Sequence, residues 1–291
     1  MKFENTEVWG FEHALRGMRN PKNSWDKSDS YFNITDDYDE GILDVADAWV
    51  YQNHPEWDGH EDTKEFFDLE DKYCDWLITE GVLKESKDYQ YRDNAFIGPN
   101  DMKLAQTLIK AGPEHRKFLR QIFVSVDITA PLYWWKEMDQ YKIGTITDST
   151  STMHKLTSKP ITLESFETDD FNPEIVYYEI PGAQNDIGML SDFMIEQLEF
   201  LRQKYLETKD KKYWKELVRW LPESWLQTRT WSANYEVVRS ICQQRRNHKL
   251  NEWAGKDDPS KNNFIKWARE ELPYAQYLIF DDENIPFQIE K

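Results

Sequence analysis

An alternating strand pattern that runs directly into a proline is the feature that most limits how this chain can fold. From Phe118 to Ile128 apolar side chains recur at positions 122, 124, 126 and 128, which is the period of a strand with one buried face. Pro131 is tolerated in the first turn of a helix, and Thr129 can cap such a helix. Helical spacing follows on one stripe formed by Leu132, Trp135, Met138 and Lys142. The sequence therefore predicts a strand that leads into a helix, with Trp134 and Trp135 in the core.

Helical periodicity recurs in the rest of the chain. Helices are predicted for residues 101–112, 189–206, 211–220, 232–253 and 264–271. Residues 1–100 contain helical pieces separated by acidic turns. Three prolines surround a strand-like segment at 174–178, so we interpret residues 157–186 as an insertion or hairpin.

The acidic residues are concentrated in the first third of the chain. The formal charge of the 291 residues is −18, and residues 1–100 carry 24 acidic and 10 basic side chains, a net charge of −14. Residues 211–250 have the opposite sign, with nine basic and three acidic side chains. A strongly negative chain disfavours nucleic acid or an anionic membrane as a partner. The basic stretch can nevertheless receive a small anion.

Targeting signals and paired cysteines are missing from the sequence. No window approaches the 18 apolar residues of a membrane helix, and the N-terminal residues lack the apolar region of a signal peptide. Cys74 and Cys242 are 168 positions apart and have no metal-ligand spacing. We therefore expect a cytoplasmic protein with no membrane partner, no disulfide and no structural zinc.

The sequence lacks the signature motifs of several enzyme classes. Neither GxGxxG, Walker A, GxSxG nor HExxH occurs, which disfavours dinucleotide-fold dehydrogenases, P-loop enzymes, serine hydrolases and zincins. An acidic segment could in principle bind a metal through His54, Asp58, His60, Glu61 and Asp62. Such clusters are common in solvated acidic loops, so no metal site is predicted.

Two segments carry residues that suit ligand chemistry. Residues 144–151 are almost all Thr, Ser, Asp and Gly, which fits phosphate or ribose contacts or an ordinary surface turn. In the predicted helix after Ser232, one face is formed by Asn234, Val238, Ile241, Arg245, His248 and Glu252. Buried polar groups on such a face must either pair internally or meet a ligand.

The same two segments resemble a known family. Residues 221–253, LPESWLQTRTWSANYEVVRSICQQRRNHKLNEW, are similar to the C-terminal signature of flavin-dependent thymidylate synthases, Leu-Pro, Trp-(Thr/Ser)-Val-Asn-Ala-Arg-Ser-Leu, Leu-Arg, His-Ala-Gln-x-Glu-Ile. Leu221-Pro222, Trp231 to Asn234 and Arg245 fall in register, whereas His248 and Glu252 match after a one-residue shift. Residues 128–155, ITAPLYWWKEMDQYKIGTITDSTSTMHK, resemble the unit that leads into R-H-R-x-x-S-x-N-E-x-S-x-R-Y. The resemblance covers about 117–253, somewhat under half of the chain.

The second segment departs from the family pattern at its charged positions. The replacements are Gln140-Tyr141-Lys142 for Arg-His-Arg, Thr145 for Ser, Thr147-Asp148 for Asn-Glu, Thr150 for Ser, and Thr152-Met153 for Arg-Tyr. A cation, a carboxylate and two hydroxyls are kept. Charges that the family uses on flavin and nucleotide are lost.

The resemblance implies an α+β fold, an antiparallel sheet flanked by long helices, with an additional acidic, mostly helical N-terminal layer. It divides the chain into an extension, 1–112, packed on a nucleotide- and flavin-binding domain, 113–291, with the insertion near 157–186. The family binds FAD, forms homotetramers with shared active sites, and makes dTMP from dUMP with methylenetetrahydrofolate and NADPH. Divergence with an added layer is typical of a phage-encoded homologue.

Roles follow from the resemblance position by position. Arg245 would hold and polarise the uracil, and is the catalytic residue expected. The nucleotide would further contact Arg219, Asp148, Thr150 and Thr152. The flavin would contact Gln140, Tyr141, Lys142, Thr145, Asn234, Ser240 and His248.

Alternatives remain open at this point. A related enzyme could modify C5 of a pyrimidine nucleotide in another way, such as hydroxymethylation. The altered Arg-His-Arg motif also fits a nucleotide-binding homologue without catalysis. A third reading is an unrelated helical protein whose acidic N-terminal part docks a basic partner.

Overall fold

The computed structural model describes residues 1–32, 46–47, 50–51, 63–79, 95–169, 171–172, 177–179 and 187–283. Two compact units can be distinguished. Unit 1 comprises residues 1–3, 127–142 and 147–231, and unit 2 comprises residues 4–126, 143–146 and 232–291. The acidic segment with His54, His60 and its neighbours lies outside the described residues.

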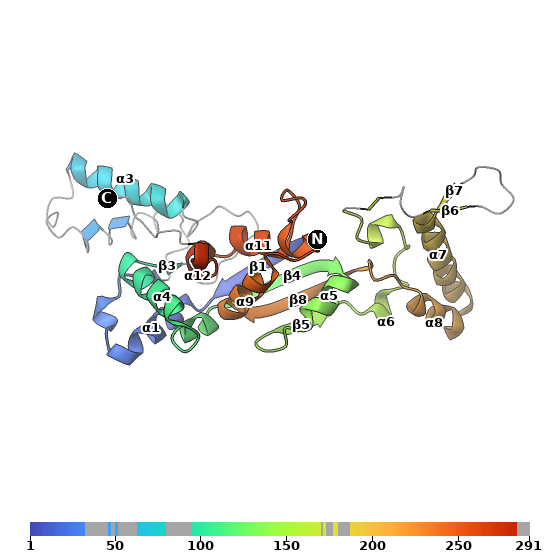
Figure 1. Cartoon of the computed structure of the whole chain (residues 1–291), viewed down its shortest axis with the longest axis horizontal. Helices are drawn as coiled ribbons and strands as arrows, with labels where there is room; N and C mark the ends of the chain where they lie inside the picture. The colour runs from blue at the N-terminus through green and yellow to red at the C-terminus, as the bar shows by residue number, and fades with distance from the viewer. Residues whose placement is uncertain are drawn as a thin grey trace. The chain divides into compact units, whose positions relative to one another are not determined.

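The main sheet has four strands in the order β1-β4-β8-β5 (Figure 1). The strands are β1 (Lys2–Trp9), β4 (Phe123–Pro131), β5 (Ile146–Ser149) and β8 (Leu226–Asn234). β1 comes from the N-terminal part of the chain, which therefore contributes to the sheet as well as to the helices. In its described residues this part also contains α1 (Phe11–Arg19), α3 (Lys64–Thr79) and α4 (Pro99–Ala111).

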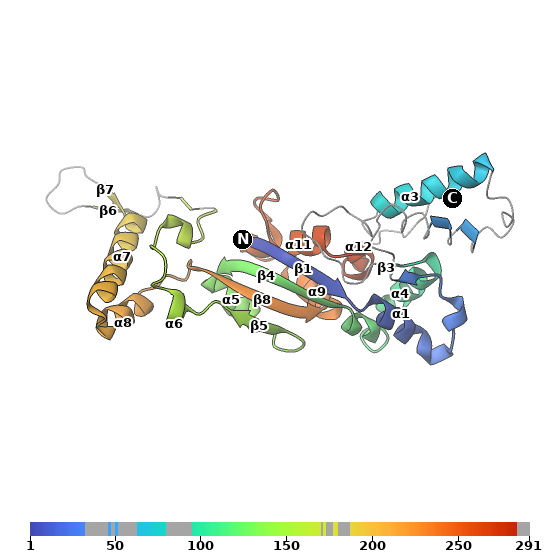
Figure 2. The ribbon, with the colours of Figure 1, turned by 180° about the vertical axis from the view of Figure 1, so that it is seen from behind.

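The two central strands are antiparallel. Ser125 lies beside Ser232 (Oγ to Oγ, 3.0 Å), Thr230 donates to Asp127 (2.5 Å), and Thr129 lies beside Thr228 (2.7 Å). The residue number falls on β8 as it rises on β4, which is the pairing of antiparallel strands. Figure 2 shows the two strands side by side. The α+β class with an antiparallel sheet flanked by helices is confirmed.

The predicted one-sided strand is confirmed from Phe123 onward, in β4. Its predicted start at Phe118 was wrong, because residues 117–121 form a 3-10 helix in which the adjacent Phe118 and Leu119 are both buried. Val124, Val126, Ile128 and Ala130 are buried, while the side chains between them are partly exposed. The strand leads directly into α5 (Leu132–Met138), and both Trp134 and Trp135 are fully buried. The predicted cap was wrong, because Thr129 belongs to β4 and bonds to Thr228 across the sheet. Pro131 takes the N-cap position of α5 without a side-chain bond.

Two further predictions need correction. Part of the hydroxyl-rich loop is strand β5, whose four residues are all exposed, so alternation could not reveal it. The long helix predicted for 232–253 is instead β8 followed by α9 (Tyr235–Arg245), a break, and α10 (Asn251–Ala254). Residues 243–249, QQRRNHK, contain no apolar side chain to bury, and a helix without a buried stripe gains little from packing.

In unit 1, the long helix α7 (Leu190–Thr208) packs against α8 (Lys211–Arg219) (Figure 1). The cluster between them and the preceding loops is small and consists of Leu156, Ile161, Phe166, Leu198 and Leu217. Arg202, which is buried, donates to both carboxylate oxygens of Glu199 at 2.8 Å and to the Thr157 carbonyl at 3.0 Å. The bonds from Arg202 to the Glu199 carboxylate lower the pKa of Glu199 to about 2. β6 (Tyr177–Glu179) and β7 (Ile187–Met189) form an antiparallel pair. β6 lies within the segment 157–186 predicted as an insertion or hairpin, whereas β7 follows that segment and includes Met189, which was predicted to begin a helix.

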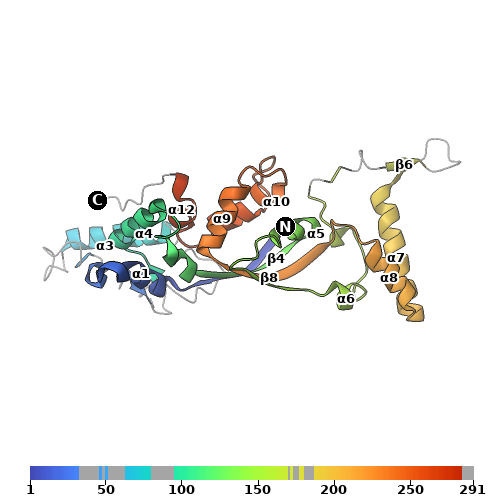
Figure 3. The same ribbon diagram turned by 60° about the horizontal axis from the view of Figure 1, so that its bottom comes forward.

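Unit 2 contains a larger apolar core. α1 and α4 lie side by side (Figure 3), and the buried ion pair Arg19–Asp101 (2.5 Å) joins them. Pro99 occupies the first turn of α4 and Gly112, with φ of 114°, ends it, so the predicted end of this helix is confirmed. α9 packs against α11 (Phe264–Glu271), which in turn contacts α12 (Ala275–Leu278). In the described part of the chain, no helix is long and apolar enough to cross a membrane.

Candidate functional site

A row of polar side chains runs along one face of β4 and β8. It comprises Ser125, Asp127, Thr129, Thr228, Thr230 and Ser232. The opposite face of β8 is formed by Gln227, Arg229, Trp231 and Ala233, of which all but Arg229 are buried. This row was not predicted, because the helical spacing after Ser232 hides the strand β8 that ends at Asn234. The signal was present in residues 227–233, where small hydroxyl residues alternate with larger side chains.

In unit 1, the residues expected at the nucleotide follow one another along the sheet edge. Asp148 is exposed on β5, and Thr152 begins the short helix α6 (Thr152–Lys155). Between them, the Thr150 N–H and hydroxyl both donate to the Thr228 carbonyl, at 2.9 and 3.2 Å. These two bonds attach the segment that contains the three predicted residues to β8.

A side chain of β8 reinforces this attachment. The buried Gln227 donates through Nε2 to the Thr150 carbonyl at 2.9 Å. Next to Thr152, the Ser151 hydroxyl caps α6 by accepting from the His154 N–H, and it lies 2.9 Å from His154 Nδ1. The side chains of His154 and Lys155 are exposed within one turn of Thr152, which stands where the resembled family has an arginine.

The residues expected at the flavin in unit 1 form the turn after α5. Gln140 and Lys142 are exposed and Tyr141 is half-buried. Backbone bonds to Glu137, Met138 and Gln140 close the turn. Asp139 at its start accepts from Arg229 Nη1 at 2.8 Å. Arg229 was not predicted as a site residue, since only the folded chain brings it to Asp139.

Arg219 occupies a different setting from the one its expected role requires. It lies in the last turn of α8, is half-exposed, and is paired with Glu216 one turn earlier. A phosphate would therefore have to compete with this carboxylate.

In unit 2, Asn234 lies at the junction of β8 and α9. Its Oδ1 accepts from the Val237 N–H at 3.1 Å and so caps α9. The neighbouring loop lies close to this cap, because a Cβ at Gly144 would meet Val237 Cγ2 at 3.0 Å and Asn234 Nδ2 at 3.3 Å. Gly144 also has φ of 78°, which favours glycine. The structure thus places the predicted residue Asn234 beside the loop that contains Thr145.

Arg245 and His248 come together around one aromatic ring. The Arg245 guanidinium carbon lies 4.8 Å from the centroid of the Trp253 ring, and the His248 ring meets the same indole edge-to-face at 6.1 Å. His248 Nδ1 accepts from the Leu250 N–H at 3.2 Å, which holds the imidazole at the break after α9. Ser240, also predicted, lies earlier on α9 and accepts from Gln244 at 2.9 Å.

The two cysteines are unsuited to nucleophilic catalysis. Burial raises the pKa of the Cys242 thiol, and burial together with nearby carboxylates raises the pKa of Cys74 to about 11. Both thiols are therefore protonated at neutral pH, whereas the reactive form is the thiolate.

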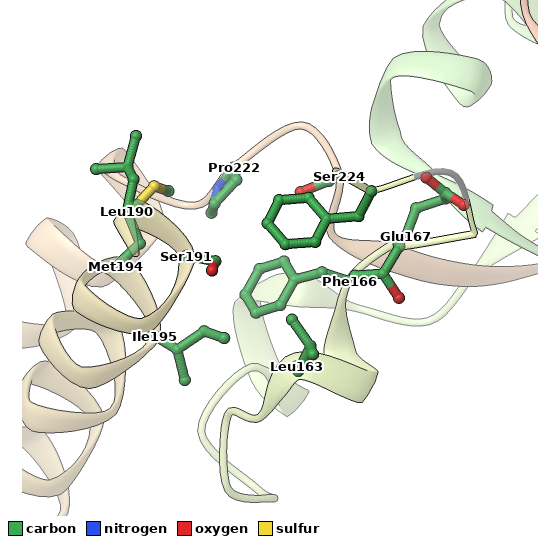
Figure 4. A pocket seen from close by; sticks show the side chains of 11 residues that line it. Leu163, Phe166, Glu167, Leu190, Ser191, Met194, Ile195, Pro222 and Ser224 are labelled. Atoms are coloured by element: carbon green, nitrogen blue, oxygen red, sulfur yellow. The ribbon is translucent and has the colours of Figure 1, made fainter. Parts of the chain in front are cut away.

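A separate apolar hollow of about 140 Å³ lies in unit 1. Figure 4 shows the side chains of α7 on one side and Phe166 and Leu163 on the other. None of the predicted site residues lines it.

Comparisons with known proteins give structural neighbours only. No protein-family model and no curated protein sequence matches the chain. Two solved structures of flavin-dependent thymidylate synthase ThyX from Helicobacter pylori, each with FAD and dUMP, are similar to it with a TM-score of 0.44. Their identities are 14% and 15%, and the alignments cover 82% of this chain and 94% and 93% of theirs.

Proposed function

We propose that the chain is a flavin-dependent thymidylate synthase-like enzyme that converts dUMP to dTMP with FAD, methylenetetrahydrofolate and NADPH. The observation that carries the proposal is the pairing of the two family-like segments. The first segment, residues 128–155, contains β5 and the second half of β4. The second segment, residues 221–253, contains β8. In the sheet, β8 lies between β4 and β5. Segments that are far apart in sequence but adjacent in the fold are expected of a shared ligand site.

The side chains around Asn234 fit the chemistry of a flavin. A flavin presents acceptors at its ring carbonyls and pyrophosphate. Asn234 Oδ1 accepts the hydrogen bond from the Val237 N–H. The other end of the side-chain amide, the Nδ2 donor, lies next to Gly144 and its loop. Thr145, in the same loop, adds a hydroxyl. Lys142 remains a proposed flavin contact that supplies a cation. Bound flavin would supply the carbon and hydride chemistry.

The role proposed for Arg245 is to bind the uracil and stabilise negative charge on its carbonyl edge. The guanidinium of Arg245 lies over the Trp253 ring, which is a cation–π contact. The N–H groups at the edge of the guanidinium form hydrogen bonds, which set its orientation. Asp148, Thr150 and Thr152 would contact the nucleotide, with Arg219 as a phosphate partner. Gln140, Tyr141, Ser240 and His248 remain proposed flavin contacts, and a homotetramer with shared sites remains the proposed assembly.

Release of tritium from 5-tritiated dUMP, with FAD, NADPH and methylenetetrahydrofolate present, tests the activity. Arg245→Lys is expected to lose about a hundredfold in rate, because a lysine cannot form the bidentate contact. Arg246→Lys is the matched control, since Arg246 is a neighbouring exposed arginine paired with Asp282, and we expect its rate to stay near that of the unaltered chain. Equal rates for the two variants would remove Arg245 from the reaction.

The turn at residues 140–142 favours a second candidate, a nucleotide-binding homologue without catalysis. One cation stands there in place of three charged or chargeable family residues. Binding of dUMP in calorimetry without tritium release would support this candidate. A hydroxymethylated product in mass spectrometry would instead identify a related C5-modifying enzyme.

A further inference from the structure

A continuous set of side-chain contacts joins the turn after α5 to the segment that begins at Thr150. Asp139 in the turn accepts from Arg229 Nη1 at 2.8 Å. Arg229 Nε donates to Gln227 Oε1 at 3.0 Å, and Gln227 Nε2 donates to the Thr150 carbonyl at 2.9 Å. We refer to these four residues as the Asp139–Thr150 link. All of them belong to unit 1.

The link is held rigidly at its centre. Arg229 lies over the Trp135 ring, with its guanidinium carbon 4.3 Å from the ring centroid, and Trp135 is fully buried. Trp135 Nε1 in turn donates to the Gln227 carbonyl at 2.9 Å. Gln227 is 7% exposed and the Arg229 side chain 15%. The two bonds made by the Gln227 side chain are partly shielded from water, and shielded hydrogen bonds are stronger than exposed ones. Both bonds donated by Arg229 are charge-assisted, although the one to Asp139 lies at the surface.

The shape of Arg229 matters for this arrangement. A planar guanidinium can bond Asp139 and Gln227 at the same time while its face rests on an indole ring. A lysine at the same place could satisfy one of these partners but not all three. The link therefore depends on arginine and not on positive charge alone.

We infer that Arg229 and Gln227 are positioning residues that couple the turn at 139–142 to the segment at 150–152, so that a ligand bound at one segment orders the other. The part of this inference that concerns ligands rests on the proposed function, which assigns flavin contacts to the turn at 139–142 and nucleotide contacts to the segment at 150–152. The coupling itself is a property of the folded chain without ligand. It fixes the spacing of the two segments through one strand, β8.

Hydrogen–deuterium exchange of the full chain, read by mass spectrometry, tests the coupling without ligand. Arg229→Met removes the centre of the link with both of its hydrogen bonds, and is expected to speed exchange at least about tenfold in both segments. Asp139→Asn changes only a half-exposed side chain at one end, so the fold is retained. We expect it to speed exchange in residues 150–156 about threefold, in addition to its local effect on the turn.

Asp127→Asn is the matched control, because Asp127 also bonds to β8, at Thr230, but on the opposite face. It should leave both segments within about twofold of the unaltered rates. Unchanged exchange in residues 150–156 of Asp139→Asn would overturn the inference, and so would an equal effect of Asp127→Asn.

Addition of dUMP separates this inference from the proposed function. In the unaltered chain, dUMP should slow exchange in residues 150–156 and also in the turn at 139–142, whereas in Arg229→Met the second effect should be lost. If dUMP protects no segment, the proposed function fails, while the experiment without ligand still decides whether the link couples the two segments. Arg229→Lys should behave like Arg229→Met, and restoration of coupling by lysine would contradict the role given to the guanidinium fork.

Discussion

The two units maintain their structures by different means. In unit 2, aromatic side chains from separate helices are almost fully buried against one another, such as Trp253, Phe264 and Trp267. Buried ion pairs, Arg19–Asp101 and Arg239–Asp281, add to this core. The helical part of unit 1 has the small apolar cluster around Leu217, with partly exposed neighbours, and depends more on hydrogen bonds such as those of Arg202. On β8 of the same unit, Gln227 makes a comparable bond to the Thr150 carbonyl.

This difference indicates where the chain tolerates change. Burial of apolar area stabilises a unit in proportion to the size of its core. A small cluster bordered by partly exposed side chains can relax around a substitution, whereas a tightly packed aromatic core cannot. Both the turn at 139–142 and the segment at 150–152 belong to unit 1, so their geometry depends more on polar contacts.

The largest effect is expected in the core of unit 2. Phe264 is fully buried between Trp253 and Trp267, and Phe264→Ala should reduce the free energy of unfolding by about 3–5 kcal/mol. Urea denaturation measures this loss. A loss below about 1 kcal/mol would mean that unit 2 does not depend on this core.

A smaller effect is expected in unit 1. Leu217 is fully buried in its cluster, but Ile195, Leu201 and Trp225 at the edge can move toward the space that Leu217→Ala leaves. We expect a loss of about 2–3 kcal/mol, at the low end for such substitutions. Hydrogen exchange should show faster opening in α7 and α8 while the amides of α9 keep their rates. Equal acceleration in α9 would contradict the comparison of the two units.

The smallest effect is a dependence of stability on pH in unit 1. Arg202 lowers the pKa of Glu199 to about 2 from its ordinary value of 4.5, so the folded chain binds this proton less readily than the unfolded chain. The stabilisation by Glu199 is therefore complete above about pH 4.5 and is lost as the pH falls toward about 2. The difference in stability between the unaltered chain and Glu199→Gln should shrink over that interval.

Glu207→Gln is the matched control for this pH dependence. Glu207 also lies on α7, pairs with Lys204 at 2.8 Å and is largely exposed, and exposed pairs contribute little to stability. Its difference from the unaltered chain should be near zero at every pH. A pH-independent effect of Glu199→Gln would contradict the role given to its ionised form.

Helices and strands could be predicted from the sequence where one face of the segment is buried and the other is exposed. The pattern in β4 gave a correct strand because Val124, Val126 and Ile128 face the core while Ser125 and Asp127 do not. β5 is exposed throughout, and its residues carry no such signal. α9 was predicted to be too long because a helical stripe can be drawn through Arg245 to His248 even where no apolar side chain supports it.

Among the site residues, local features were predictable and long-range partners were not. Asn234 has the residue type of a helix cap and occupies that position, although the predicted helix began two residues earlier, at Ser232. The contact of Arg229 with Asp139, 90 positions away, depends on how β8 and α5 pack, and no local pattern reports it. The same holds for the approach of the Gly144 loop to Asn234.

The central claim is that this chain binds a flavin and a pyrimidine nucleotide, and one absorption measurement tests it most directly. The full chain is incubated with FAD, freed of unbound cofactor, and its spectrum is recorded between about 350 and 500 nm, before and after addition of dUMP. We expect flavin bands that remain with the protein and shift when dUMP is added. A spectrum without flavin bands, together with no heat of dUMP binding in calorimetry, would contradict the account.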